Sequence, residues 1–199
     1  MSRIALSLAP LLLLTGFAAA QTSPTTAAPP QGPAAAPRGN AEAAHGTKGH
    51  REREHEGLQN VKVSLSQALG TAESKGPGRA IEADFENEGG KVYYEIKVLG
   101  SDGKLTDHHI DANSGQVIKS DNHPVESWFV RLKPADVQNA PTTLKQAVAT
   151  AEQKAGGKAA EAQVEREASS VQYKVTVVTG GNQEQEIVVG ADGKIMPNK

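Results

Sequence analysis

Apolar residues recur along the chain with two different periods, and the switch from one period to the other is made twice. After Ser64 small apolar residues follow at the spacing of one helix face, at Leu65, Ala68, Leu69 and Ala72. The segment KGPG predicts the end of this helix, because glycine and proline interrupt helices. From Ile81 apolar and charged residues alternate, which predicts strands joined by turns at EGG, GSDG and DANSG.

The same succession of patterns returns 79 residues later. Thr143 precedes a second helical stripe of small apolar residues, and a second alternating stretch begins near Ala160. When the sequence is aligned with itself at this offset, roughly 18 of about 50 positions are identical, which indicates a duplicated unit. The expected fold class is therefore α+β, with two repeated units that each pack one helix on a three- to four-stranded antiparallel sheet.

The first residues predict export. Arg3 precedes an apolar run that ends in the small residues Ala18, Ala19 and Ala20, as in a secretory signal peptide cut before Gln21. The run is short compared with the roughly 20 residues of a membrane span, so a stable membrane anchor is not expected. The absence of cysteine argues against a lipoprotein anchor and against disulfides. The expected location is periplasmic or secreted, and the net charge of -2 gives no reason to expect nucleic acid as a partner.

Five segments follow from these patterns. Residues 1–20 form the signal peptide, and residues 21–60 are expected to be a disordered spacer, rich in proline and alanine and then in charge. Residues 61–120 form the first unit, residues 121–141 a connector, and residues 142–199 a divergent second unit. Trp128 and Phe129 give the connector its apolar cluster, which either packs onto a unit or stays exposed as an interaction patch.

The helix pattern SLSQALGTAESKG, the strand segment YEIKV and the turn DANSG, in this order, resemble the PepSY domain family. The second copy keeps Tyr173 and the strand rhythm but has Gly190 where the first has Asp111. The resemblance implies a non-catalytic module of exported proteins, found in propeptides of thermolysin-like metallopeptidases and linked there to inhibition and folding of the enzyme. For a protein that carries the module alone, it implies protein binding, with a peptidase as the expected class of partner.

Candidate binding residues lie on the first strand of the first unit. The carboxylates of Glu82, Asp84, Glu86 and Glu88 share one face, where they either form a docking surface for a basic partner or only keep that face hydrated. Asp111, Asn113 and Gly115 do not have the spacing of a calcium loop and favour a braced turn. His108 and His109 are adjacent on a strand, so one of them should lie on the core side.

The histidines of the spacer suggest metal binding as an alternative to protein binding. His45, His50 and His55 recur every five residues, which predicts either a weak zinc, copper or nickel site or simply a polar spacer. No nucleophile elbow, phosphate loop or metalloprotease motif is present, so no enzyme activity and no cofactor are expected. The sequence thus predicts an exported, non-enzymatic protein-binding module, with peptidase inhibition or regulation as its expected role. The alternative is a periplasmic metal-binding or metal-responsive protein. The oligomeric state is left open.

Overall fold

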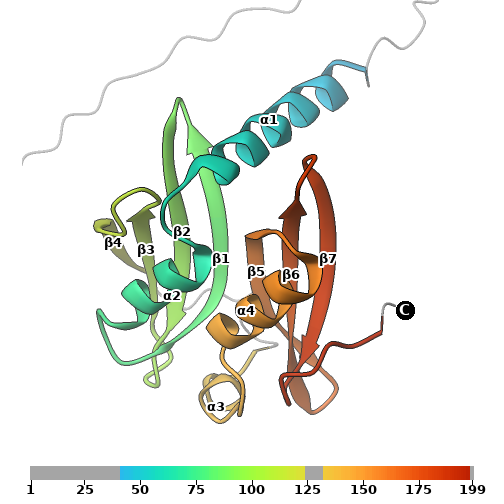
Figure 1. Cartoon of the computed structure of the whole chain (residues 1–199). Helices are drawn as coiled ribbons and strands as arrows, with labels where there is room; N and C mark the ends of the chain where they lie inside the picture. The colour runs from blue at the N-terminus through green and yellow to red at the C-terminus, as the bar shows by residue number, and fades with distance from the viewer. Residues whose placement is uncertain (1–40, 124–131, 198–199) are drawn as a thin grey trace, which may run out of the picture. The chain divides into compact units, whose positions relative to one another are not determined.

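The structure is a computed structural model that describes residues 41–123 and 132–197, with the backbone alone for residues 41–50. Figure 1 shows the arrangement of its helices and strands. The helices are α1 (Ala41–Asn60), α2 (Leu65–Glu73), α3 (Pro134–Gln138) and α4 (Leu144–Ala155). The strands are β1 (Arg79–Glu88), β2 (Lys91–Leu99), β3 (Leu105–Asp111), β4 (Val117–His123), β5 (Lys158–Glu167), β6 (Ser170–Thr179) and β7 (Gln183–Gly190).

All of these strands belong to one antiparallel sheet, in the order β4-β3-β2-β1-β5-β6-β7. The α+β class is confirmed, but the expectation of a separate sheet for each unit is wrong. The two groups of strands join where β1 pairs with β5, with Ala83 opposite Ala162 at the centre of the pairing. Pairing satisfies backbone groups that would otherwise form two open sheet edges, and the two alanines, both fully buried, add little bulk at the junction.

Helices α2 and α4 cover one face of the sheet, and they also pack against each other (Figure 1). Ser64 and Thr143 cap them as predicted. Each hydroxyl accepts the backbone N–H of a glutamine three residues later, Gln67 or Gln146, whose side chain accepts the cap residue's own N–H. The buried stripes are those read from the sequence, and their alanines allow the helices to lie close to the strands.

The end of α1 is bound by the opposite half of the sheet. The Lys158 ammonium, at the start of β5, donates to the carbonyls of Leu58 at 3.2 Å, Gln59 at 2.8 Å and Val61 at 3.3 Å. These carbonyls lie at the C-terminus of α1, where a cation is favourable because helix carbonyls there lack intrahelical partners. The segment that leads into the first unit is therefore held by a residue of the second.

The connector is bound in the reciprocal way. Arg79, at the start of β1, donates through Nη1 to the carbonyls of Val137 at 3.1 Å and Ala140 at 2.7 Å. Arg79 stands 79 residues before Lys158, and its two acceptors stand 79 residues after Leu58 and Val61. The two sets of hydrogen bonds are therefore equivalent under the 79-residue offset of the repeat. The segment before each unit is bound by the first strand of the other unit.

These contacts correct the prediction of a disordered spacer for residues 41–60, the part of the predicted spacer (residues 21–60) that the structure describes. Residues 41–60 form helix α1, and Leu58 and Val61 at its end are buried in the core. Helix α1 was hard to predict because the rest of it has no apolar face, and its position depends on distant partners in β1 and β5. In the connector, Leu132 and Val137 are buried, whereas Trp128 and Phe129 lie outside the described residues, as do residues 21–40. No helix of the described residues combines the length and the apolar character needed to cross a membrane.

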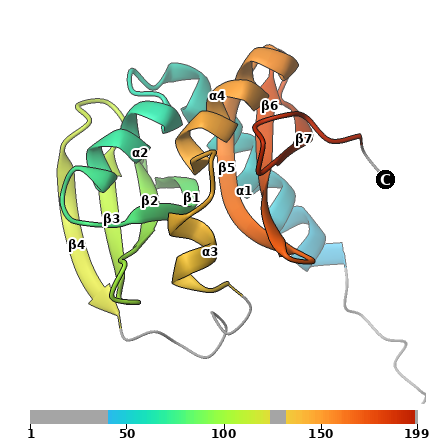
Figure 2. The same ribbon diagram turned by 90° about the horizontal axis from the view of Figure 1, so that it is seen from below.

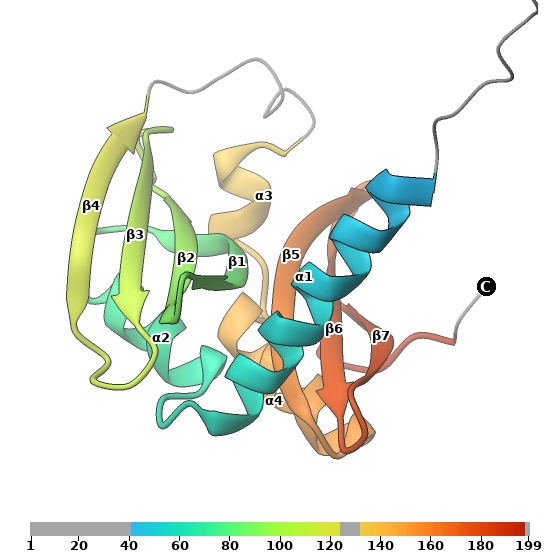
Figure 3. The same cartoon turned by 90° about the horizontal axis from the view of Figure 1, so that it is seen from above.

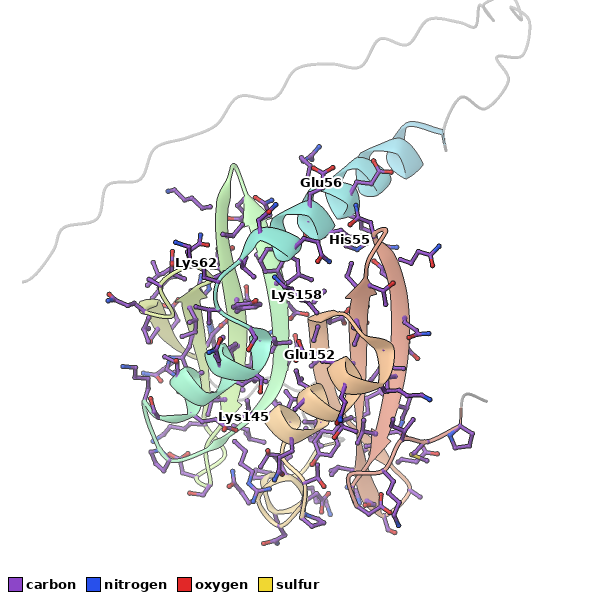
Figure 4. All side chains as sticks on the ribbon, in the orientation of Figure 1. His55, Glu56, Lys62, Lys145, Glu152 and Lys158 are labelled. Atoms are coloured by element: carbon purple, nitrogen blue, oxygen red, sulfur yellow. The ribbon has the colours of Figure 1, made fainter. Side chains whose placement is uncertain are left out.

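The reciprocal hydrogen bonds lead to a prediction about stability. Lys158→Met and Arg79→Met should each lower the free energy of unfolding by about 1 to 3 kcal/mol, because the carbonyls that accept from them lose a charged donor in a partly buried place. Lys62→Met is the matched control, since this lysine is exposed and should change stability by less than about 0.5 kcal/mol (Figure 4). Urea unfolding of the full chain measures all three. Equal midpoints for Lys158→Met and Lys62→Met would contradict the prediction.

Candidate functional site

The sheet has a second face, opposite α2 and α4. Figure 2 shows these two helices together on one side of the sheet, with α3 on the other. Since side chains alternate along each strand, the residues between the core positions of β1, β2, β3 and β5 point to this second face. Its carboxylates define the surface called here the acidic face: Glu82, Asp84, Glu86, Glu95, Asp107, Glu161 and Glu165.

The junction of β1 and β5 brings carboxylates from distant parts of the chain together. Asp84 on β1 lies opposite Glu95 on β2 and, on its other side, opposite Glu161 on β5. Three acidic residues therefore form one row across three neighbouring strands. Like charges placed directly opposite one another on a sheet are destabilising, so this row is costly for the fold.

The electrostatics of Asp84 show this repulsion. Burial, followed by the charges of Glu82 and Glu161, raises the pKa of Asp84 to about 7. Burial and the neighbouring Glu95 likewise raise the pKa of Asp107 to about 6. Both carboxyl groups thus hold protons far more tightly than a solvated aspartate, and a cation that reached them would relieve the same repulsion.

Lysines on the acidic face compensate part of this charge. The Lys97 ammonium donates to Glu82 Oε1 and lies 3.9 Å from Glu95 Oε1. Lys174 lies 3.2 Å from Glu165 Oε1. Lys97 thus lies between Glu82 and Glu95, a member of the row of Asp84, Glu95 and Glu161, and Lys174 pairs with Glu165 beside the row. The raised pKa of Asp84 shows that these lysines do not neutralise the row.

A hollow of about 250 Å³ opens at one end of the acidic face, beside α1. Figure 3 shows α1 alongside β5. Five of the ten lining residues are acidic: Glu54, Asp84, Glu86, Glu161 and Glu184. The others are Arg51, His55, Phe85, Ala160 and Thr176. Small-molecule sites usually measure about 300 to 1,000 Å³, so this hollow is better matched to a single long side chain. The charges of its lining favour lysine or arginine.

The structure groups some of the predicted binding residues and separates others. Glu82, Asp84 and Glu86 lie together on the acidic face, whereas Glu88 is exposed at the end of β1. Trp128 and Phe129 lie outside the described residues. The sequence prediction omitted Glu95 and Asp107, although the alternation of Glu95 with the apolar Tyr94 and Ile96 placed it on the polar face of its strand. Only the strand register shows that Glu95 joins the row with Asp84 and Glu161, and that Asp107 lies on the same face.

The histidines have separate environments. His55 is buried, and its Nε2 lies 2.9 Å from Glu184 Oε1, so it belongs to the fold rather than to a free spacer. The side chains of His45 and His50 lie outside the described residues, and a metal site formed by the three stays a prediction. As expected, His108 and His109 point to opposite faces: His108 is buried on the helix side, with Nδ1 2.8 Å from Ser120 Oγ, and burial lowers its pKa.

The turn after β3 is braced from within. Asp111 Oδ1 accepts hydrogen bonds from the backbone N–H groups of Asn113 at 3.0 Å and Ser114 at 2.7 Å, and from the Ser114 hydroxyl at 2.9 Å. Gly115 has φ of 72°, a conformation that favours glycine. This is the braced turn that the sequence favoured over a calcium loop.

Helices α2 and α4 on one face of an antiparallel sheet define the class of fold, and comparison with family models finds a match for part of the chain. Residues 62–121 match the model of the PepSY family, described as "Peptidase propeptide and YPEB domain". The resemblance is confirmed over these residues, and the PepSY character of residues 142–199 stays a prediction. A crystal structure from Clostridium difficile 630, of a chain provisionally described as a lipoprotein, is similar at 20% identity with a TM-score of 0.45, over 72% of this chain and 97% of that chain. Comparison with curated proteins gives no significant match.

The raised pKa of Asp84 gives a pH-dependent prediction. Between its unfolded pKa, about 3.9, and its folded pKa, about 7, the folded chain binds a proton that the unfolded chain has lost. That proton stabilises the fold at low pH, and the contribution is lost as pH rises to about 7. Asp84→Asn should therefore gain stability relative to wild type by about 1 to 2 kcal/mol between pH 4 and pH 8, after allowance for solvent screening.

Urea unfolding of both proteins at several pH values, with a chelator present, measures this difference. Asp121→Asn is the control, because pairing with Lys119 lowers the pKa of Asp121 and the relative stability of that variant should not rise with pH. A stability difference between Asp84→Asn and wild type that stays constant from pH 4 to pH 8 would contradict the raised pKa.

Proposed function

We propose that this protein is an exported, non-catalytic binding module of the PepSY type, which holds a basic segment of a partner protein against the acidic face. The observation that carries the proposal is the row of Asp84, Glu95 and Glu161 across β1, β2 and β5. Aligned like charges weaken a sheet, and a binding role gives a reason for their presence. The predicted signal peptide supports export.

The hollow beside α1 supports a basic partner. Its acidic lining and its volume of about 250 Å³ suit one lysine or arginine side chain, while the rest of the row can pair with neighbouring positive charges. Binding would place a cation near Asp84, whose protonated form is favoured in the free protein by repulsion from Glu82 and Glu161. The partner's charge would then stabilise the ionised form.

The class of partner is inferred from the family. The matched family is described by its occurrence in peptidase propeptides, and a propeptide acts by binding its enzyme. A peptidase is therefore the partner class proposed here, with inhibition or assisted folding as the consequence of binding. A non-catalytic role agrees with the general character of PepSY domains.

The proposal predicts which substitutions weaken binding. The full chain is immobilised, exported proteins of the producing cell are passed over it, and each retained protein is identified and its Kd measured. The double variant Asp84→Asn/Glu161→Gln should raise the Kd for the true partner at least tenfold, since removing two facing charges costs about 1.4 kcal/mol of binding free energy. A retained peptidase is then assayed for inhibition by the wild-type chain.

The matched control removes two carboxylates elsewhere. Glu52→Gln/Glu56→Gln changes net charge by the same amount at exposed positions of α1, where Glu56 lies away from the strands (Figure 4). Its Kd should stay within twofold of wild type. If both double variants lose affinity equally, binding depends on net charge alone and the acidic face is not the docking surface. If no exported peptidase is retained, the partner class is wrong.

A further inference from the structure

One corner of the acidic face gathers a nitrogen ligand and two carboxylates. Glu95 on β2 lies opposite His109 on β3, and Asp107 precedes His109 by two residues, so all three point to the same face. One potential ligand atom from each residue lies within 4.8 Å of the other two. The sheet register itself fixes this trio, without help from a loop.

Asp107 gives an independent sign that a ligand belongs there. The residue is only 8% exposed, and its Oδ1 is buried without a hydrogen-bond partner. A buried, unpaired carboxylate oxygen costs on the order of 1 to 3 kcal/mol, more when charged. Such an oxygen is unusual in a folded protein unless another group, such as a metal ion, binds it.

The other two residues are held in suitable positions. The His109 ring stacks on Tyr93, with ring centroids 5.0 Å apart and planes 7° from parallel, which fixes its orientation. Its Nε2 lies 3.9 Å from Glu95 Oε2, while the second oxygen of Glu95, Oε1, lies 3.9 Å from the Lys97 ammonium. Glu95 thus presents one oxygen to His109 and the other to Lys97.

Lysines beside the trio also pair with carboxylates outside it. Lys97 donates a hydrogen bond to Glu82, and Lys119 on β4 pairs with Asp121. Asp84, opposite Glu95, adds a further acidic group beside the trio.

We propose that Glu95, Asp107 and His109 bind a zinc ion, with water completing the coordination. Zinc takes carboxylate oxygens and imidazole nitrogens at about 2.0 to 2.2 Å, which places its ligands about 3.5 Å from one another. The ligand atoms of the trio lie within 4.8 Å of one another, so binding requires the side chains to move slightly closer together. The imidazole favours zinc over magnesium and calcium, which prefer sets made of oxygen alone.

This site is separate from the histidines of α1 and does not depend on the proposed partner. Isothermal titration of the metal-free full chain with zinc chloride, at neutral pH, should give a site that His109→Phe and Asp107→Asn each weaken at least tenfold. His109→Phe keeps an aromatic ring to stack on Tyr93, and Asp107→Asn keeps the side-chain shape. Zinc should also raise the thermal midpoint of wild type and leave that of His109→Phe unchanged.

Two control variants locate the bound metal. His123→Ala removes an exposed histidine of the neighbouring strand β4, and His45→Ala/His50→Ala removes two histidines of α1; both should stay within twofold of wild type in Kd. Loss of zinc binding in the α1 variant, with His109→Phe unchanged, would place the metal in the N-terminal segment and overturn the proposal. Wild-type affinity in both His109→Phe and Asp107→Asn would overturn it equally.

Discussion

The pairing of β1 with β5 is the interaction on which the rest of the structure depends. It turns two groups of strands into one sheet, and Ala83 opposite Ala162 forms its centre. Arg79 and Lys158, at the starts of these two strands, reach across to the segments that lead into the opposite halves. Units of about 55 residues bury little apolar surface by themselves, and the shared sheet with its reciprocal hydrogen bonds compensates for the lack of disulfides.

The same pairing builds the acidic face. Asp84 and Glu161 are 77 positions apart in sequence, yet β1 and β5 place them opposite one another, and Glu95 extends the row onto β2. Burial and mutual repulsion then raise the pKa of Asp84 to about 7. Repulsion among these carboxylates destabilises the free protein, and a bound positive charge would relieve that repulsion. Both proposals, a basic protein segment and a zinc ion at Glu95, Asp107 and His109, follow from this property.

Local patterns in the sequence were enough to predict the repeated helices and strands but not their assembly into one sheet. The caps Ser64 and Thr143, the apolar stripes of α2 and α4 and the braced turn at Asp111 depend on neighbours within a few residues, and all were predicted. Helix α1 was missed because Leu58 is buried by elements far along the chain. Glu95 and Asp107 were not recognised as site residues for a related reason, since strand register is a non-local property.

Native-state hydrogen exchange at the backbone amides of the β1–β5 junction tests this account most directly. If one sheet forms the core, the junction amides that bond between the strands, around Ala83 and Ala162, should exchange only through global unfolding, with the same urea dependence as the helical amides of α4. Faster exchange at the junction, independent of urea, would show that the two halves separate locally. The row of Asp84, Glu95 and Glu161 would then not persist, and the acidic face would lose its basis.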